Sequence, residues 1–129
     1  MVKILRSKEA PRYKREEGIT SYLLASARTC NAAFLTTTLV ELAPGGQQQV
    51  HSHEPEQVYF LLEGHGRMTV GIEEAEVRAG ECVFVPSSMS HGLRNTGSGT
   101  LRYFSAAAPS FSGEELQRLW PLNPEGSKG

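Results

Sequence analysis

The sequence predicts an all-β domain, a sandwich or barrel of short strands followed by one short helix. Turn-forming residues recur at roughly the 8–12-residue spacing that is typical of sandwiches and barrels. The stretches between these turns are rich in Leu, Val and Thr, which favour strands. The length of 129 residues fits a single domain, because domains usually run to roughly 100–200 residues.

The expected strands follow one another along the chain, and turn residues separate them. The first, Ile19–Leu24, is our candidate for pairing at the sheet edge with a second chain. The Pro-Gly-Gly run at 44–46 ends the second strand, and Gly64 and Gly80 mark later turns. The strands expected after the first are Phe34–Leu42, Val58–Leu62, Arg67–Ile72, Glu76–Arg78, Glu81–Val85 and Leu101–Ala106.

The chain divides into three parts. Residues 1–18 form a charge-rich arm whose basic residues are partly balanced by glutamates, as on a solvated edge. Residues 19–111 form the barrel, and residues 112–129 form a short helix with a loose tail. Ser112 and Glu115 have the order of a capping box, with Ser at the N-cap and Glu at N3. We expect this helix to cover the body of the barrel.

Composition excludes several classes of protein. The 13 basic and 14 acidic residues give a formal net charge of −1, which argues against a basic nucleic-acid binder and against electrostatic attraction to a membrane. No run approaches the roughly 18 apolar residues of a membrane span, and no signal peptide is visible, so we expect a cytoplasmic protein. Cys30 and Cys82 form no metal or disulfide pattern and are expected to be buried thiols.

Three of the four histidines lie in two short stretches. His51 and His53 are two positions apart, so in a strand both imidazoles project from the same face and can reach one point. Gln57 keeps that alternation if the chain stays extended, and a folded barrel could bring His91 across to them. Two interpretations stay open from the residues alone: a metal site, or buried histidines held by hydrogen bonds. For His65, between two glycines, we favour the second.

Together with the glycines and the proline around them, these residues resemble the two motifs of the cupin family. The positions that match the first motif are Gly45, His51, His53, Gln57 and Gly64, and those that match the second are Gly80, Pro86, Ser88, His91 and Asn95. Every spacing of both motifs is kept. The resemblance covers Gly45–Asn95 and implies a double-stranded β-helix, or jelly-roll, barrel. It also implies a divalent metal ion inside the barrel and a tendency to dimerise.

Two positions depart from the family pattern. Ser88 replaces a turn glycine, which is a mild change provided that the backbone there avoids positive φ. Gln57 replaces a glutamate, so the resemblance implies three histidines and a neutral amide oxygen as the metal ligands. The neighbouring Glu56 could substitute, but strand alternation turns it outward. Loss of the carboxylate leaves the metal centre about one charge more positive, which favours an anionic substrate.

Strand alternation also nominates the lining of the pocket. Tyr59 lies on the same face as Gln57, and a phenol near a metal could donate a proton or a hydrogen bond. An ordinary inward-facing barrel tyrosine is the simpler interpretation. The expected pocket residues are Gln49, Tyr59, Phe84, Asn95 and Phe104, with Tyr103 as the alternative to Phe104.

The resemblance leaves two classes of function open. The first is a mononuclear metalloenzyme that acts on a small carboxylate-bearing molecule by isomerase, lyase or dioxygenase chemistry. Its ion would be Mn, Fe, Ni, Cu or Zn, held by His51, His53, Gln57 and His91. The alternative is a non-catalytic module that binds a small ligand or a metal. In both cases we expect a small-molecule partner and a homodimer, with no nucleic acid and no membrane. Sugar-nucleotide epimerisation without a metal is disfavoured, because it would not need three converging imidazoles.

Overall fold

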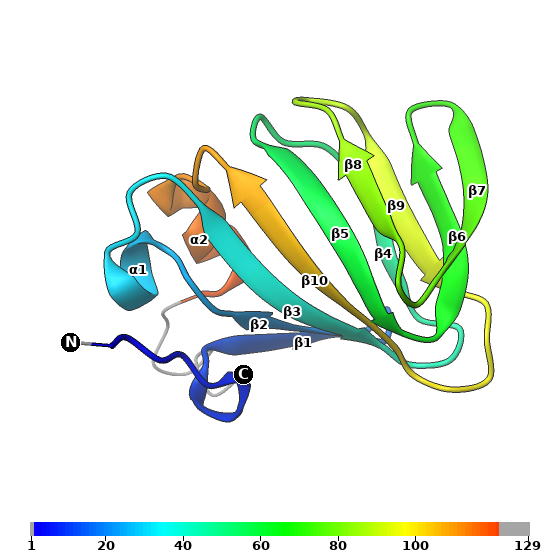
Figure 1. Ribbon diagram of the computed structural model, residues 1–129, viewed down its shortest axis with the longest axis horizontal. Coiled ribbons are helices and arrows are strands. Elements are labelled where there is room, and N and C mark those ends of the chain that lie inside the picture. The colour runs from blue at the N-terminus through cyan, green and yellow to red at the C-terminus, as the bar shows by residue number, and fades with distance from the viewer. Residues whose placement is uncertain (1, 122–129) are drawn as a thin grey trace.

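Two antiparallel β-sheets form the body of the protein in the computed structural model, which describes residues 2–121. Figure 1 shows both sheets, with the two helices at one end of the larger sheet. The larger sheet contains, in spatial order, β1 (Arg12–Arg15), β2 (Ile19–Leu23), β3 (Thr36–Leu42), β10 (Leu101–Ala108), β5 (Glu56–Glu63) and β8 (Cys82–Val85). The smaller sheet contains β4 (Gln47–His51), β9 (His91–Asn95), β6 (His65–Val70) and β7 (Glu73–Arg78).

The strand order is that of a jelly roll. β10 lies between β3 and β5, so the last strand of the chain joins two strands that precede it by more than thirty residues. Consecutive strands β4 and β5 belong to different sheets, as do β7 and β8. An all-β jelly roll with a short C-terminal helix, the class expected from the sequence, is confirmed.

The N-terminal segment contributes more structure than the sequence indicated. Arg12–Arg15, within the expected charged arm, forms β1 and pairs antiparallel with β2. β2 also pairs with β3 and therefore has a neighbour on each side, so Ile19–Leu24 offers no free edge to a second chain. A 3₁₀ turn (Ser7–Glu9) precedes β1, and the short helix α1 (Ala27–Cys30) follows β2; neither was expected.

The main core fills the space between the two sheets. Strand alternation puts one face of each strand inside, as on β3 and β10, where Leu42 pairs with Leu101 and Val40 with Tyr103. Burial of each Leu or Val side chain contributes roughly 1.5–3 kcal/mol. The buried members of this cluster are Ile19, Val40, Leu42, Tyr59, Leu61, Met68, Val77, Val85, Leu93, Leu101 and Tyr103.

A second apolar cluster lies under helix α2 (Gly113–Leu119). Ser112 caps the helix as predicted, since its hydroxyl accepts a hydrogen bond from the Glu115 N–H at 3.1 Å. Trp120 follows the helix and donates from its indole N–H to the Ser21 carbonyl. The cluster contains Leu23, Ala107, Phe111, Leu116 and Trp120. The expected loose tail, Leu122–Gly129, lies outside the described residues. Neither α-helix in the described part of the chain has the length and hydropathy of a membrane span.

Candidate metal site

Three histidine side chains converge inside the barrel. His51 ends β4 and pairs across the smaller sheet with His91, the first residue of β9, and His53 follows two residues after His51. One ring nitrogen of each histidine lies within 4.8 Å of those of the other two. Two nitrogens that bind one ion at about 2.1 Å lie at most about 4.2 Å apart. Small rotations of the rings therefore suffice for the three to hold a metal ion.

Backbone hydrogen bonds orient two of the imidazoles. The Nδ1 of His51 lies 2.8 Å from the carbonyl oxygen of Gln49, and the Nδ1 of His91 lies 2.9 Å from that of Met89. The His51 Nδ1 also lies 3.2 Å from the Gln48 Nε2. At His91 the bond to a carbonyl places the proton on Nδ1, which leaves a lone pair on Nε2. The Nε2 of His91 is buried and has no hydrogen-bond partner among the described residues. Such outer contacts are the usual means of fixing the tautomer and orientation of a metal-binding histidine.

The three imidazoles are kept neutral by their surroundings. Burial, with a smaller contribution from the neighbouring histidines, lowers the pKa of both His51 and His53 to about 4, although a backbone hydrogen bond at each opposes the shift. Burial also lowers the pKa of His91. A neutral imidazole is the form that binds a metal, because protonation removes the lone pair. At neutral pH the site is therefore ready to bind an ion without first losing protons.

Gln57 lies on the inner face of β5 with its amide held in one orientation. Its Nε2 donates to the Ser105 hydroxyl at 2.7 Å, and its Oε1 is buried with no partner among the residues that the structure describes. The adjacent Glu56 is exposed, as strand alternation predicted. Gln57 lines the same cavity as the histidines, so its free amide oxygen is available as a neutral oxygen ligand for a metal ion.

The cavity beside the histidines is small and carries no acid. Its volume is about 40 Å³, near the roughly 30 Å³ that one water occupies in the liquid. The described residues that line it include His51, His53, Gln57, Tyr59 and Tyr103, and neither Asp nor Glu is among them. An ion bound there by neutral ligands would keep its full positive charge, and that charge attracts an anion.

Tyr59 packs directly against this site. Its ring stacks on Tyr103 with 4.3 Å between centroids and meets the His91 ring edge-on at 5.8 Å. Burial raises the pKa of the Tyr59 phenol well above its usual value, so the group stays protonated. It can donate a hydrogen bond but is unsuited to act as a base.

The loop between β8 and β9, which bonds to the backbone of His53, includes an unexpected backbone conformation. Ser88 has a φ of 64°, in the left-handed region. In this conformation the Ser88 N–H donates to the carbonyl of His53 at 2.9 Å. The condition under which serine would be a mild replacement for glycine is therefore not met, since a Cβ at positive φ is strained.

Four residues expected in the pocket lie elsewhere. Phe84 and Phe104 point to the outer face of the larger sheet, whereas Val85 and Tyr103 face inward. Gln49 is exposed and lines the larger neighbouring hollow instead of the metal cavity, because a register shift between Gln48 and His51 breaks the alternation of β4. Asn95 is buried but bonded to loop carbonyls rather than turned to the cavity. Cys82 is likewise exposed, since it shares the outward face of β8 with Phe84.

Comparison with known proteins identifies the family. Residues 38–107 match the sequence pattern of the cupin domain. The matched segment is more than half of the chain and contains the three clustered histidines and Gln57. The chain belongs to the cupin family. The resemblance found in its two motifs is thus confirmed.

Several cupins with names or structures are similar to this one. The dimethylsulfoniopropionate lyase DddW of Ruegeria pomeroyi is 32% identical over 79 residues, which are 61% of this chain and 52% of the lyase. The oxalate-binding protein of Thermotoga maritima is 30% identical over 86 residues, 66% of this chain and 70% of that protein. The chain therefore spans about half of the lyase. KdgF of Halomonas sp. has a TM-score of 0.75 at 17% identity, covering 90% of this cupin and 100% of KdgF, and this likeness shows the fold alone.

Sequence reasoning missed three polar or aromatic residues that this cupin turns toward the histidines. Arg15 of β1, Gln48 of β4 and Trp120 after α2 all line the cavity. Gln48 could not be distinguished from Gln49 without the register shift. Arg15 lies in a charge-rich segment without alternating apolar and polar residues, so the sequence does not show which side chains face inward. Trp120 was expected only to help cover the barrel, and it also lines the cavity.

Proposed function

We propose that this cupin is a mononuclear metalloenzyme that acts on a small carboxylate-bearing anion. A divalent transition metal, Mn, Fe, Ni, Cu or Zn, would be held by His51, His53 and His91, with the Gln57 amide oxygen as fourth ligand. One observation carries the proposal: polar atoms of His53, His91 and Gln57 are buried without partners among the described residues. Each such atom costs roughly 1–3 kcal/mol when nothing binds it, and a shared ion would satisfy all of them.

The residues fit a metal of this class by their chemistry as well. Neutral imidazole and amide oxygen suit borderline transition metals, and three or four protein ligands leave positions open on an octahedral ion. When bound, the ion supplies a Lewis acid for isomerase or lyase chemistry, or, as iron or copper, a centre for dioxygenase chemistry. The chain itself supplies a cavity without carboxylates, so that a negatively charged group is the favoured ligand of the open face.

Tyr59 is our candidate for a further catalytic contact. Its ring lies against His91 and lines the cavity, and its raised pKa keeps the phenol protonated. In this proposal the phenol acts only as a donor, to a substrate oxygen that becomes more negative during the reaction. Tyr59→Phe would keep the stacking on Tyr103 and lower turnover by roughly 10²-fold or more, without lowering the metal content.

A non-catalytic function is the second candidate. It is favoured by the relative from Thermotoga maritima, which is named for binding oxalate and shares 30% identity. In this form the same metal and open face would capture a small carboxylate for sensing or storage. The two candidates share the metal site and differ only in whether the bound anion is changed.

Elemental analysis of protein purified without a metal-affinity tag tests the site. We expect about one transition-metal ion per chain, and none in the double variant His51→Ala/His91→Ala, whose circular dichroism should still show a folded barrel. A stoichiometry well below one that Mn, Fe, Ni, Cu and Zn all fail to restore would contradict the proposal. Retention of the metal by the double variant would show that other residues are the ligands.

Product analysis separates the enzyme from the binding module. The metal-loaded protein is incubated in D₂O with small carboxylic acids, with and without O₂, and followed by proton NMR and an oxygen electrode. Exchange of a C–H proton next to a carboxylate, conversion, or O₂ uptake supports the enzyme. Binding with no change in any acid supports the module.

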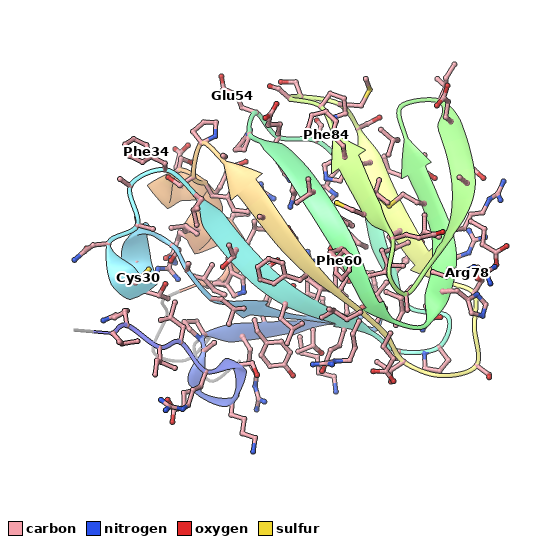
Figure 2. The ribbon with its side chains drawn as sticks, viewed as in Figure 1. Cys30, Phe34, Glu54, Phe60, Arg78 and Phe84 are labelled. Carbon is pink, nitrogen blue, oxygen red and sulfur yellow. The ribbon has the colours of Figure 1, made fainter. Side chains whose placement is uncertain are left out.

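We further propose that the cupin is a homodimer. Phe60 and Phe84, labelled in Figure 2, are 40% and 55% exposed on the outer face of the larger sheet, and Leu62 is 44% exposed. A second copy would cover these apolar side chains. Light scattering at micromolar concentration is expected to give the mass of two chains, and the mass of one chain would contradict the dimer. The cytoplasmic location stays a prediction.

A further inference from the structure

Arg15 reaches the metal cavity from the N-terminal strand. On β1, Tyr13 and Arg15 are half-buried and Arg12 and Lys14 are exposed, so the strand turns Arg15 toward the inside of the barrel. Arg15 lines the 40 Å³ cavity together with His51, His53 and Gln57. A guanidinium is thus placed on the wall of a site whose other polar groups are neutral.

The hydrogen-bonding capacity of this guanidinium is largely unused. One terminal nitrogen donates to the Gln48 side-chain oxygen at 3.1 Å, and the Nε–H is buried without a partner among residues 2–121. No Asp or Glu of that range forms an ion pair with Arg15. A guanidinium carries five donors in a rigid fork that matches a carboxylate. Arg15 is only half-buried, but a partly desolvated cation without a counter-charge still favours an anionic ligand.

A second, larger hollow adjoins the first and provides room for the ligand. Its volume is about 160 Å³, and the two hollows share Arg15, Gln48, His51 and Leu119 as walls. Arg118 also lines the outer hollow, and Glu17 is the one carboxylate among its described lining residues. A cavity of roughly 150 Å³ is large enough for benzene, so this space together with the metal cavity admits a small organic acid. Arg15 therefore stands at the junction between the metal cavity and a compartment of small-molecule size.

We propose that the ligand of this cupin is a small dicarboxylate, bound with one carboxylate at the metal and the other on Arg15. The inference rests on the metal site proposed above and adds the second anchor. Gln48 accepts one hydrogen bond from the guanidinium, and the Nε–H has no partner among the described residues, so the fork keeps donors for an anion. Arg15 is thereby the residue that separates dicarboxylates from monocarboxylates. A monocarboxylate of equal length can reach the metal but leaves Arg15 without a counter-charge.

Calorimetric titration of the zinc-loaded protein with succinate and with butyrate, two acids of equal chain length, tests this assignment. We expect wild type to prefer succinate and Arg15→Gln to weaken succinate binding by about 10- to 100-fold, the usual range for a charge-assisted hydrogen bond. Butyrate binding should stay unchanged in the variant. Arg12→Gln is the matched control, because Arg12 lies on the same strand with its side chain outside, and it should keep the wild-type preference.

A second measurement needs no variant to fold. In the ¹⁵N spectrum of wild type, the Arg15 Nε–H resonance should shift when succinate is added and move little with butyrate. The assignment is overturned if metal-loaded Arg15→Gln keeps the full preference for succinate. It is also overturned if succinate binds to wild type and the Arg15 resonance does not shift. Neither result would contradict the metal site. Failure of wild type to take up zinc and each of Mn, Fe, Ni and Cu overturns the proposed function and the inference with it.

Discussion

Two sets of buried polar side chains behave in opposite ways in this cupin. Around Asn95, at the end of β9, every polar atom of the side chain is bonded. The Nδ2 donates to the carbonyls of Leu42, Ala43 and Gly99 at 2.8–3.1 Å, and the Oδ1 accepts from the Gly97 N–H at 2.9 Å. At the start of the same strand, the Nε2 of His91 is buried with no partner among the described residues.

The difference distinguishes polar side chains that stabilise the fold from polar side chains that are available to bind a ligand. Asn95 ties three chain segments together, and its hydrogen bonds account for its burial. By contrast, one ring nitrogen each of His53 and His91 and the amide oxygen of Gln57 are buried without a partner among the described residues. Such groups require an explanation, such as a bound ion or ligand. Two residues on one five-residue strand, both expected at the site from the sequence, thus have different tasks.

Removal of the satisfied side chain should have the largest effect on stability. Asn95→Ala deletes four hydrogen bonds and leaves buried carbonyls without donors, so we expect the free energy of unfolding to fall by about 3 kcal/mol or more. Urea denaturation of the metal-free protein measures it. Thr96→Ala, at the exposed neighbouring position, should stay within about 0.5 kcal/mol of wild type. A similarly small loss for Asn95→Ala would remove the distinction drawn above.

Acid should act on the histidine cavity and spare the Asn95 bonds, which involve no titratable group. The native pKa of His51 and His53 is about 4, below the unfolded value near 6.5. Between these values the unfolded chain takes up protons that the native state excludes, so stability of the metal-free protein falls as the pH falls from about 6.5 to 4.

Thermal melting at intervals across this range, in chelator, measures the slope. His53→Gln should make the slope shallower, because it removes one of the histidines that burial keeps neutral in the native state. An equal slope in wild type and His53→Gln would contradict the account.

Removal of an unsatisfied group should have a smaller effect, in the opposite direction. Gln57→Leu combined with Ser105→Ala removes both partners of one buried hydrogen bond together with the free Oε1. Replacement of both partners by apolar groups is close to neutral or stabilising. We expect the metal-free double variant to be as stable as wild type or about 1 kcal/mol more stable, while its metal affinity falls. A loss as large as that of Asn95→Ala would show that Gln57 has a structural task.

The smallest expected effect concerns the loop that holds His53. Ser88→Gly keeps the N–H that bonds to the His53 carbonyl and removes the Cβ at positive φ. We expect a gain of about 0.5–1 kcal/mol in the free energy of unfolding. Ser87→Gly is the control, because the Ser87 hydroxyl bonds to the Glu54 carbonyl and its loss should destabilise. A destabilised Ser88→Gly would mean that the loop is not strained at this residue.

Much of the fold could be predicted because strand-forming residues, turn residues and the helix cap all indicated the same elements. The expected Phe34–Leu42 and Ile19–Leu24 coincide with β3 and β2 to within two residues, and the capping residue Ser112 starts α2. The strand β1 was missed because its inward face consists of Tyr13 and Arg15, which carry no hydrophobic alternation. The same composition concealed the one cation on the described wall of the metal cavity.

The lining of the pocket was harder to predict than the ligand set. The spacing of the two motifs predicts His51, His53 and His91 as ligands. This prediction does not depend on knowing which residues of a strand face inward. On β8 and β10, by contrast, apolar residues occupy both faces, so alternation shows that Tyr103 and Phe104 point in opposite directions but not which of them faces inward. Register shifts such as the one before His51 are also invisible in a single sequence.

Titration of the metal-free protein with Zn²⁺, followed through the side-chain ¹⁵N resonances of its four histidines, tests the central claim most directly. The account predicts that one equivalent shifts the ring nitrogens of His51, His53 and His91 together and leaves those of His65 in place, with no further change at higher ratios. Unchanged resonances of the three, or a response confined to His65, would contradict a metal site in this cavity.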